Sequence, residues 1–270
     1  VAQLDTGAYP GDESSLKKSN NTTFTYTGGT TTFCLQATNS QLSGKSFYIT
    51  EAGSIQSGSC PPAVATMQAF TSAQCAALPV YDGSNTAAIR SLTDSRGGTT
   101  RTYEVAKLAD NKCWMLTNLK LGSTTGTTTL TPSDSNIATN FTLPQLTTTD
   151  AADYDNPRAY GPVPGDTGAG ATNYGYLYNF PAATAGESRT SFPATGGNAS
   201  YSICPANWRL PTGGATTSDF GQLDIAFGGT GNYAGSGQAN IARWQYAGPF
   251  KGVFAGDWWN GSFYVQGDYG

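Results

Sequence analysis

Hydrophobic and polar residues alternate with a two-residue period through the first part of the chain, as far as residue 62. Glycine-rich breaks separate the alternating runs, and Pro61-Pro62 ends the last of them, because proline cannot donate to a β-ladder. A period of two with such breaks predicts a small antiparallel sheet. The apolar positions of the pattern are Phe24, Tyr26, Phe33, Leu35, Ala37, Phe47, Ile49 and Ile55.

After the proline pair the apolar spacing changes to three and four residues. This spacing predicts a helix over residues 64–78 that Pro79 ends, and a short second helix that Ser84 caps and that extends to Leu92. We therefore assign residues 63–91 to a helical connector. The residues that define the first helix are Val64, Met67, Thr71, Cys75 and Leu78.

From Leu92 onward the pattern again favours strands. Turn residues at 94–98 and 110–111 flank a strand through Tyr103 and Val105, which is typical of hairpins. Residues 122–172 are rich in Thr, Gly, Asp and Pro and predict a long loop region. An aromatic strand over 174–180 and one helix, capped by Ser218 and carrying Phe220, Leu223 and Phe227, are expected further on.

These elements predict an α+β fold that is mostly β. We expect three parts: a small antiparallel sheet in residues 1–62, the helical connector in 63–91, and a second domain with long loops in 92–270. With 38% hydrophobic residues, the chain has enough apolar material to form a core.

Composition excludes several functional classes. Charged residues make up 12% of the chain, about half the usual share of roughly 25%, and histidine is absent. Catalysis by a Ser-His-Asp or Cys-His system and metal binding through histidine are therefore excluded. The net charge of −4, without any run of basic residues, argues against nucleic acid as a partner, since phosphates are neutralised by clustered Lys and Arg.

Five widely spaced cysteines indicate disulfides formed in an oxidising, extracellular compartment. An odd number leaves at least one cysteine unpaired. A bridge between Cys34 and Cys60 would close a loop of about 26 residues and contribute on the order of 3 kcal/mol. The alternative is that Cys34 is a buried free thiol.

The first 60 residues resemble the globular part of type IV pilin-like proteins from small-genome bacteria. Tyr9-Pro10 and the spacing of Cys34 and Cys60 are the most specific points of the resemblance. In that family an apolar N-terminal helix anchors the subunit in the membrane and then forms the filament core. The given sequence contains no such apolar segment, so we expect this helix to be missing from it. The matching segments are residues 7–10, 23–26, 33–38, 47–50 and 58–60.

The remainder resembles the Fibrobacter-type major paralogous domain, a secreted or surface-attached family that is similar to C-type-lectin-like folds. The resemblance implies a twisted antiparallel sheet that displays long loops. It also implies a further strand with a cysteine that pairs with Cys204. We therefore expect the second domain to be incomplete after Gly270, Cys204 to be unpaired and Cys75 to pair with Cys113. The matching segments are residues 92–96, 103–108, 111–115, 118–119, 176–179 and 203–212.

Two groups of residues are candidates for ligand binding. Asp150, Asp153, Asp155 and Asp166 lie in the long loop region and could supply oxygen ligands to Ca²⁺, although their spacing is not that of an EF-hand, and a solvated polar loop is the alternative. Trp and Tyr residues near the end of the chain lie among Gly and Asn, a mixture typical of carbohydrate or protein contacts. These are Trp244, Trp258, Trp259 and Tyr264.

Alternation along a strand places one of Trp258 and Trp259 on the exposed face, whereas Trp114 and Trp208 are expected in the core. No pair of carboxylates shows more than proximity in sequence, so we expect no catalysis and no resident cofactor.

The two resemblances together imply a type IV pilus-like subunit, structural or minor, that self-assembles into filaments on the cell surface. Its lectin-like head would contact a host cell or a glycan, and the missing N-terminal helix would be its only membrane contact. The alternative is a secreted carbohydrate- or protein-binding module that does not polymerise.

Overall fold

The structure is a computed structural model of the chain, and contacts within it divide the chain into a first unit, Val1–Val64, and a second unit, Ala65–Gly270. Each unit is described by itself. For residues 27–28, 257–259 and 262–264 the description covers the backbone alone. The described residues are 19–28, 33–43, 45–50, 54–60, 66–149, 155–187, 199–213, 215–231, 240–253, 257–259 and 262–264.

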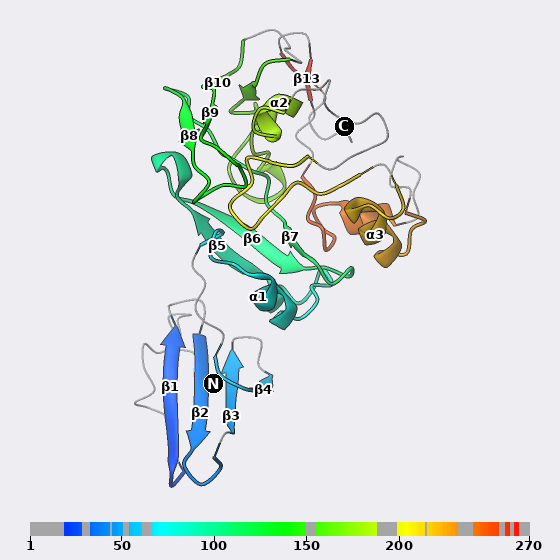
Figure 1. The fold of residues 1–270 in the computed structure, drawn as a ribbon. Helices are drawn as coiled ribbons and strands as arrows, with labels where there is room; N and C mark the ends of the chain where they lie inside the picture. The colour runs from blue at the N-terminus through cyan, green and yellow to red at the C-terminus, as the bar shows by residue number, and fades with distance from the viewer. Residues whose placement is uncertain are drawn as a thin grey trace. The chain divides into compact units, whose positions relative to one another are not determined.

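The first unit contains a four-stranded antiparallel sheet with the strands in chain order (Figure 1). This confirms the sheet that the two-residue period predicts. The strands are β1 (Thr22–Gly28), β2 (Phe33–Asn39), β3 (Ser46–Thr50) and β4 (Ile55–Ser57).

The register gives this sheet one apolar and one polar face. On the apolar face, Tyr26, Leu35, Ile49 and Ile55 form one row across all four strands, because each is the direct partner of the next. Only part of this face is covered: Phe33 is 6% exposed, whereas Ile55 is 74% exposed. A second row on the same face consists of Phe24, Ala37 and Phe47, and Phe47 is 44% exposed.

A disulfide between Cys34 and Cys60 joins β2 to the segment that follows β4. This is the pair expected from the sequence, so Cys34 is not a free thiol. The backbone N–H of Cys60 also donates to Oε1 of Gln36 over 2.9 Å. The covalent bond and the hydrogen bond thus hold the end of the first unit against the polar face of its sheet.

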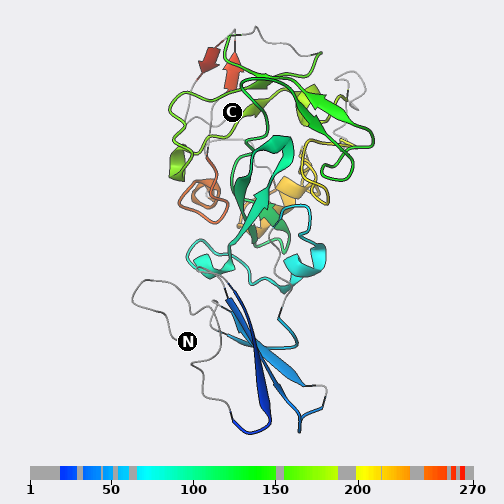
Figure 2. The ribbon, with the colours of Figure 1, turned by 90° about the vertical axis from the view of Figure 1, so that its left-hand side faces the viewer.

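The second unit is built around a three-stranded antiparallel sheet of β5 (Arg90–Asp94), β6 (Arg101–Lys107) and β7 (Cys113–Met115), visible in Figures 1 and 2. These strands are the hairpins predicted from residue 92 onward. Together with the first sheet and a few short helices, they make the fold α+β and mostly β.

The helix expected over residues 64–78 is shorter in the structure: α1 spans Ser72–Ala77. The segment just before it forms a parallel bridge to β5, and Met67 N–H donates to the Thr93 carbonyl. Thr71 and Gln74 then form a capping box that starts the helix. The buried residues Met67 and Phe70 thus reach the core from a turn, in which Phe70 N–H donates to the Met67 carbonyl, although their spacing is helical.

The second helix expected in the connector is a single 3-10 turn, η1 (Thr86–Ala88). Leu92 is not part of it: this side chain lies on β5 and is 1% exposed. Ala88 is also buried in the core of the second unit. Residues from 65 onward therefore belong to the second unit, and the connector is packed against its sheet.

The long loop region predicted over residues 122–172 is wrong in part, because this segment contains four short strands among its described residues. They are the hairpin strands β8 (Thr128–Leu130) and β9 (Phe141–Leu143), and the strands β10 (Leu146–Thr147) and β11 (Ala159–Tyr160). The sparse leucines of the segment converge into a core of their own, although they are far apart in sequence. Its buried members are Leu121, Leu130, Ile137, Leu143, Leu146, Ala159, Ala182 and Ile203.

The aromatic strand expected over 174–180 is reduced to β12 (Leu177–Tyr178), which pairs with β11, because Asn179 caps the helix α2 (Phe180–Ala183). The helix expected after Ser218 is confirmed as α3 (Asp219–Ala226), and the Ser218 hydroxyl accepts the Gly221 N–H. The other elements are η2 (Arg96–Gly98), η3 (Gly170–Thr172), α4 (Ile241–Trp244), β13 (Asp257–Trp259) and β14 (Ser262–Tyr264).

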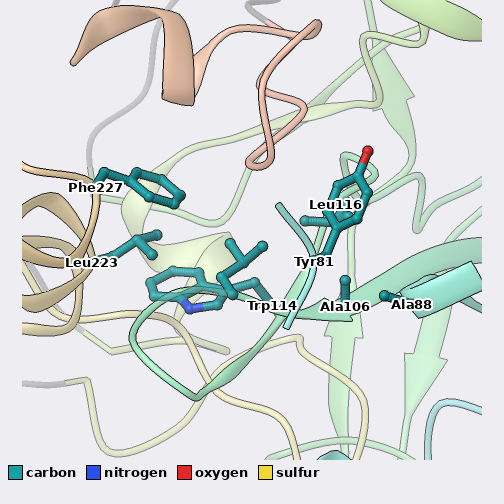
Figure 3. Close-up of a cluster of buried hydrophobic side chains, with 8 residues drawn as sticks. Tyr81, Ala88, Ala106, Trp114, Leu116, Leu223 and Phe227 are labelled. Atoms are coloured by element: carbon teal, nitrogen blue, oxygen red, sulfur yellow. The ribbon is translucent and has the colours of Figure 1, made fainter. Parts of the chain in front are cut away.

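A second core joins α3 to the three-stranded sheet. Figure 3 shows Leu223 and Phe227 of the α3 segment beside the indole of Trp114, with Ala88 and Ala106 on the other side of the cluster. In the described parts of the chain, no helix has the length and apolarity needed to cross a membrane.

Candidate functional site

Asp94 and Arg96 form a buried ion pair. Both belong to the segment 92–96, one of those that resemble the paralogous domain. The Arg96 Nη2 to Asp94 Oδ2 distance is 2.7 Å, and both side chains are almost fully buried. Arg96 also donates to Ser135 Oγ and to the carbonyl of Ile203. This guanidinium therefore joins β5 to two segments about 40 and 107 residues further along the chain.

Asp219, at the start of α3, is the centre of a second polar cluster. Its carboxylate accepts hydrogen bonds from Arg209, through Nη1 at 2.6 Å and Nη2 at 3.0 Å, and from Lys112 Nζ at 2.8 Å. Burial opposes ionisation, but the Arg209 and Lys112 hydrogen bonds outweigh it and hold the pKa of Asp219 well below its usual range. The cluster ties the 203–212 segment to α3 and to the β6–β7 turn.

Replacing Asp219 by Asn is expected to weaken the pH dependence of stability. The folded-state pKa lies below the unfolded value of about 3.9, so the ionised group stabilises the fold above that pH and the contribution disappears as pH falls towards the folded-state pKa. We expect a loss of about 2 kcal/mol for D219N at pH 7. The difference from wild type should shrink between pH 5 and about pH 2. Urea unfolding at a series of pH values measures it, and a difference independent of pH would contradict this role.

Trp244, the first of the four predicted aromatic contact residues, is half-buried in an aromatic cluster. Its ring lies 5.3 Å from that of Phe227 and 5.0 Å from that of Phe250, measured between centroids. Much of its surface therefore packs against the core. Trp258, Trp259 and Tyr264 lie on β13 and β14, and their side chains are outside the described part of the structure.

The two tryptophans expected in the core do pack against other aromatic rings. Trp114 is 9% exposed and contacts Phe220. Trp208 is half-buried, stacks on Phe70 and donates its indole N–H to the Met67 carbonyl. Both therefore have a structural role.

Of the four aspartates considered for calcium, Asp155 and Asp166 belong to the described residues. Asp166 forms an ion pair with Lys120 at 2.7 Å and also accepts the Gly168 N–H. Asp155 is exposed, and Asp150 and Asp153 lie outside the described residues. Among the described residues no group of three or more His, Cys, Asp or Glu side chains is placed to hold a metal ion.

Glu104 and Asp110, two carboxylates that are close in sequence, both have partners within the fold. Glu104 pairs with Lys251, and Asp110 accepts the indole N–H of Trp114. Cys204 is unpaired, as expected. Burial raises the pKa of its thiol, which keeps the sulfur in its unreactive protonated form.

The structure reveals one hollow that sequence reasoning missed. It lies in the first unit, on the polar face of the sheet beside the β2–β3 turn, and has a volume of about 520 Å³. We call it the polar hollow. The signal was present in the sequence, because the alternating pattern that marks apolar positions also marks the polar ones between them. The strand residues that line it are Thr23, Gln36, Thr38, Asn39 and Ser46.

No family model, curated protein or solved structure matches this chain.

Proposed function

We propose that this chain is a structural or minor subunit of a type IV pilus-like filament that displays a C-type-lectin-like head for adhesion on the cell surface. The observation that carries the proposal is the two-faced sheet of the first unit. On its apolar face Ile55 is 74% exposed and Phe47 is 44% exposed, and apolar surface left in contact with water is unfavourable. In the pilin-like family that the first unit resembles, an apolar helix forms the filament core, and such a helix would cover this face.

Two further features support a surface role. Each unit has its own disulfide, Cys34–Cys60 in the first and Cys75–Cys113 in the second, which is consistent with an extracellular protein. In the second unit, long segments between short strands are held by buried polar clusters and by their own core. A scaffold of this kind suits loops that contact a ligand.

The filament proposal is tested by electron microscopy of native material, with an antibody against the chain to label it. Labelled filaments with this chain as a repeating component support the proposal. A soluble monomer in the absence of any filament contradicts it and favours the secreted binding module.

Charge substitutions on the two faces of the sheet test the role of the apolar face. Ile55→Lys places a charge on that face, and we expect it to reduce filament number at least tenfold, because an unpaired charge in an apolar contact is strongly unfavourable. Thr25→Lys, on the opposite face, is the matched control and should assemble normally. Circular dichroism shows whether both variants fold. Equal assembly of the two folded variants would contradict the proposed use of the apolar face.

A further inference from the structure

Side-chain hydroxyls of serine and threonine line the polar hollow of the first unit. Thr23, Thr38 and Ser46 form one row across β1, β2 and β3, since each is paired with the next in the register. Among the described residues none of these hydroxyls has a hydrogen-bond partner, and the same holds for Ser40 and Ser43 of the β2–β3 turn. A hydroxyl both donates and accepts, so this row can bind the hydroxyls of a polyol or sugar.

Among the described residues that line the hollow, the one charged residue is Lys45, which is positive. Lys45 is exposed at the end of the β2–β3 turn, and no carboxylate pairs with it within the described part of the chain. The described lining residues include no Asp or Glu. In a chain whose net charge is −4, the hollow is thus a local site where an anionic group would be favoured.

The walls of the hollow are held in place from within the first unit. Gln36 accepts the Cys60 N–H through its Oε1 atom and lies 3.5 Å from Ser59 Oγ through its Nε2 atom. Asn39 donates to Thr22 Oγ1 and accepts the Gln41 N–H, which orders the start of the turn. Because these contacts exist without a ligand, little ordering entropy would be lost on binding.

We propose that the polar hollow binds an acidic saccharide, with Lys45 contacting its carboxylate and the row of hydroxyls contacting its ring hydroxyls. Tyr48 shares this face, opposite Gln36 in the register, and offers an aromatic surface next to the hollow. The inference goes beyond the filament proposal and does not depend on it. The filament uses the apolar face of the sheet, whereas the saccharide binds the polar face.

The test is an NMR titration of the full soluble chain with an oligosaccharide that ends in N-acetylneuraminic acid. Amide shifts should change at residues 36–46 and at 59, and the neutral oligosaccharide without that acid should bind about tenfold more weakly. Lys45→Gln should weaken binding of the acidic form about tenfold, whereas Lys45→Arg keeps the charge and should retain most of it. Thr38→Val should weaken binding of the acidic oligosaccharide about fivefold. Thr25→Val, on the same face but outside the hollow, should leave binding unchanged.

Three outcomes would overturn the proposal. The first is equal binding of the acidic and neutral oligosaccharides, and the second is shift changes outside the hollow. In the third, inorganic phosphate at the same concentration as the oligosaccharide displaces it from the hollow, which would reveal a simple anion site. Since binding is measured on the soluble chain, it can succeed where filaments are absent or fail where they form, so the two proposals are tested separately.

Discussion

Removing the Cys34–Cys60 disulfide is expected to unfold the first unit and leave the second folded. The bond closes a loop of 26 residues, which corresponds to about 3.5 kcal/mol of denatured-state entropy. The unit has little else to offset that loss. Among its described residues, Phe33 and Cys34 are the only ones with nearly complete burial, and its apolar face is partly exposed. A core this small rarely provides more than about 3–5 kcal/mol.

The double variant C34A/C60A tests this expectation. Thermal unfolding and limited proteolysis should show cleavage within residues 19–60 at a temperature where the second unit is protected. The matched control is C75A/C113A, which opens a loop of 38 residues in the second unit. That unit has two cores, so the control should have a lower Tm and still fold at 25 °C. A C34A/C60A variant as resistant to proteolysis as wild type would contradict the argument.

Replacing Arg96 by Met is expected to lower the free energy of unfolding by about 3–5 kcal/mol. The change leaves the buried Asp94 carboxylate without its counter-charge and leaves Ser135 and the Ile203 carbonyl without the guanidinium. Gln68 still donates to Asp94, but a neutral amide cannot compensate for the lost charge. The physical cause is thus an uncompensated buried charge.

Comparison of R96M with the double variant D94L/R96M separates that cause from loss of packing. If the unpaired carboxylate is responsible, D94L/R96M should be more stable than R96M, because it removes both charges. Arg243→Met, at an exposed position of α4, is the control and should change the free energy of unfolding by less than about 0.5 kcal/mol. Urea unfolding monitored by tryptophan fluorescence gives the free energy of unfolding of wild type, R96M, D94L/R96M and R243M. An R96M variant within 1 kcal/mol of wild type would contradict the role of the pair.

Local patterns predicted those elements whose packing partners are near in sequence. The first sheet followed from strict alternation between residues 24 and 55, and α3 followed from Ser218 with the apolar spacing of Phe220, Leu223 and Phe227. Both depend on side chains within one strand pair or one helix. The helix expected over 64–78 failed because the Thr66 bridge to β5, a contact between segments 27 residues apart, replaces helical hydrogen bonds.

The candidate binding residues likewise depend on contacts that are distant in sequence. The four aspartates considered for calcium are close in sequence: Asp150, Asp153, Asp155 and Asp166. Asp166, however, forms an ion pair with Lys120, 46 residues away. Trp244 belongs to a Gly- and Asn-rich tail, but its ring packs against Phe227 and Phe250. In each case a partner distant in sequence determines what the side chain does, and spacing does not reveal such a partner.

The sequence by itself determined the mostly β class, the alternation that gives the first sheet two faces, and the exclusion of histidine chemistry. These follow from residue type and local period, which act over a few residues. Only the tertiary structure decided that apolar residues of 122–172 contribute to a core, that Arg96 contacts a carbonyl 107 residues away, and that Lys45 and a row of hydroxyls line one hollow. Burial and charge compensation depend on which segments meet in space, and that is a property of the whole fold.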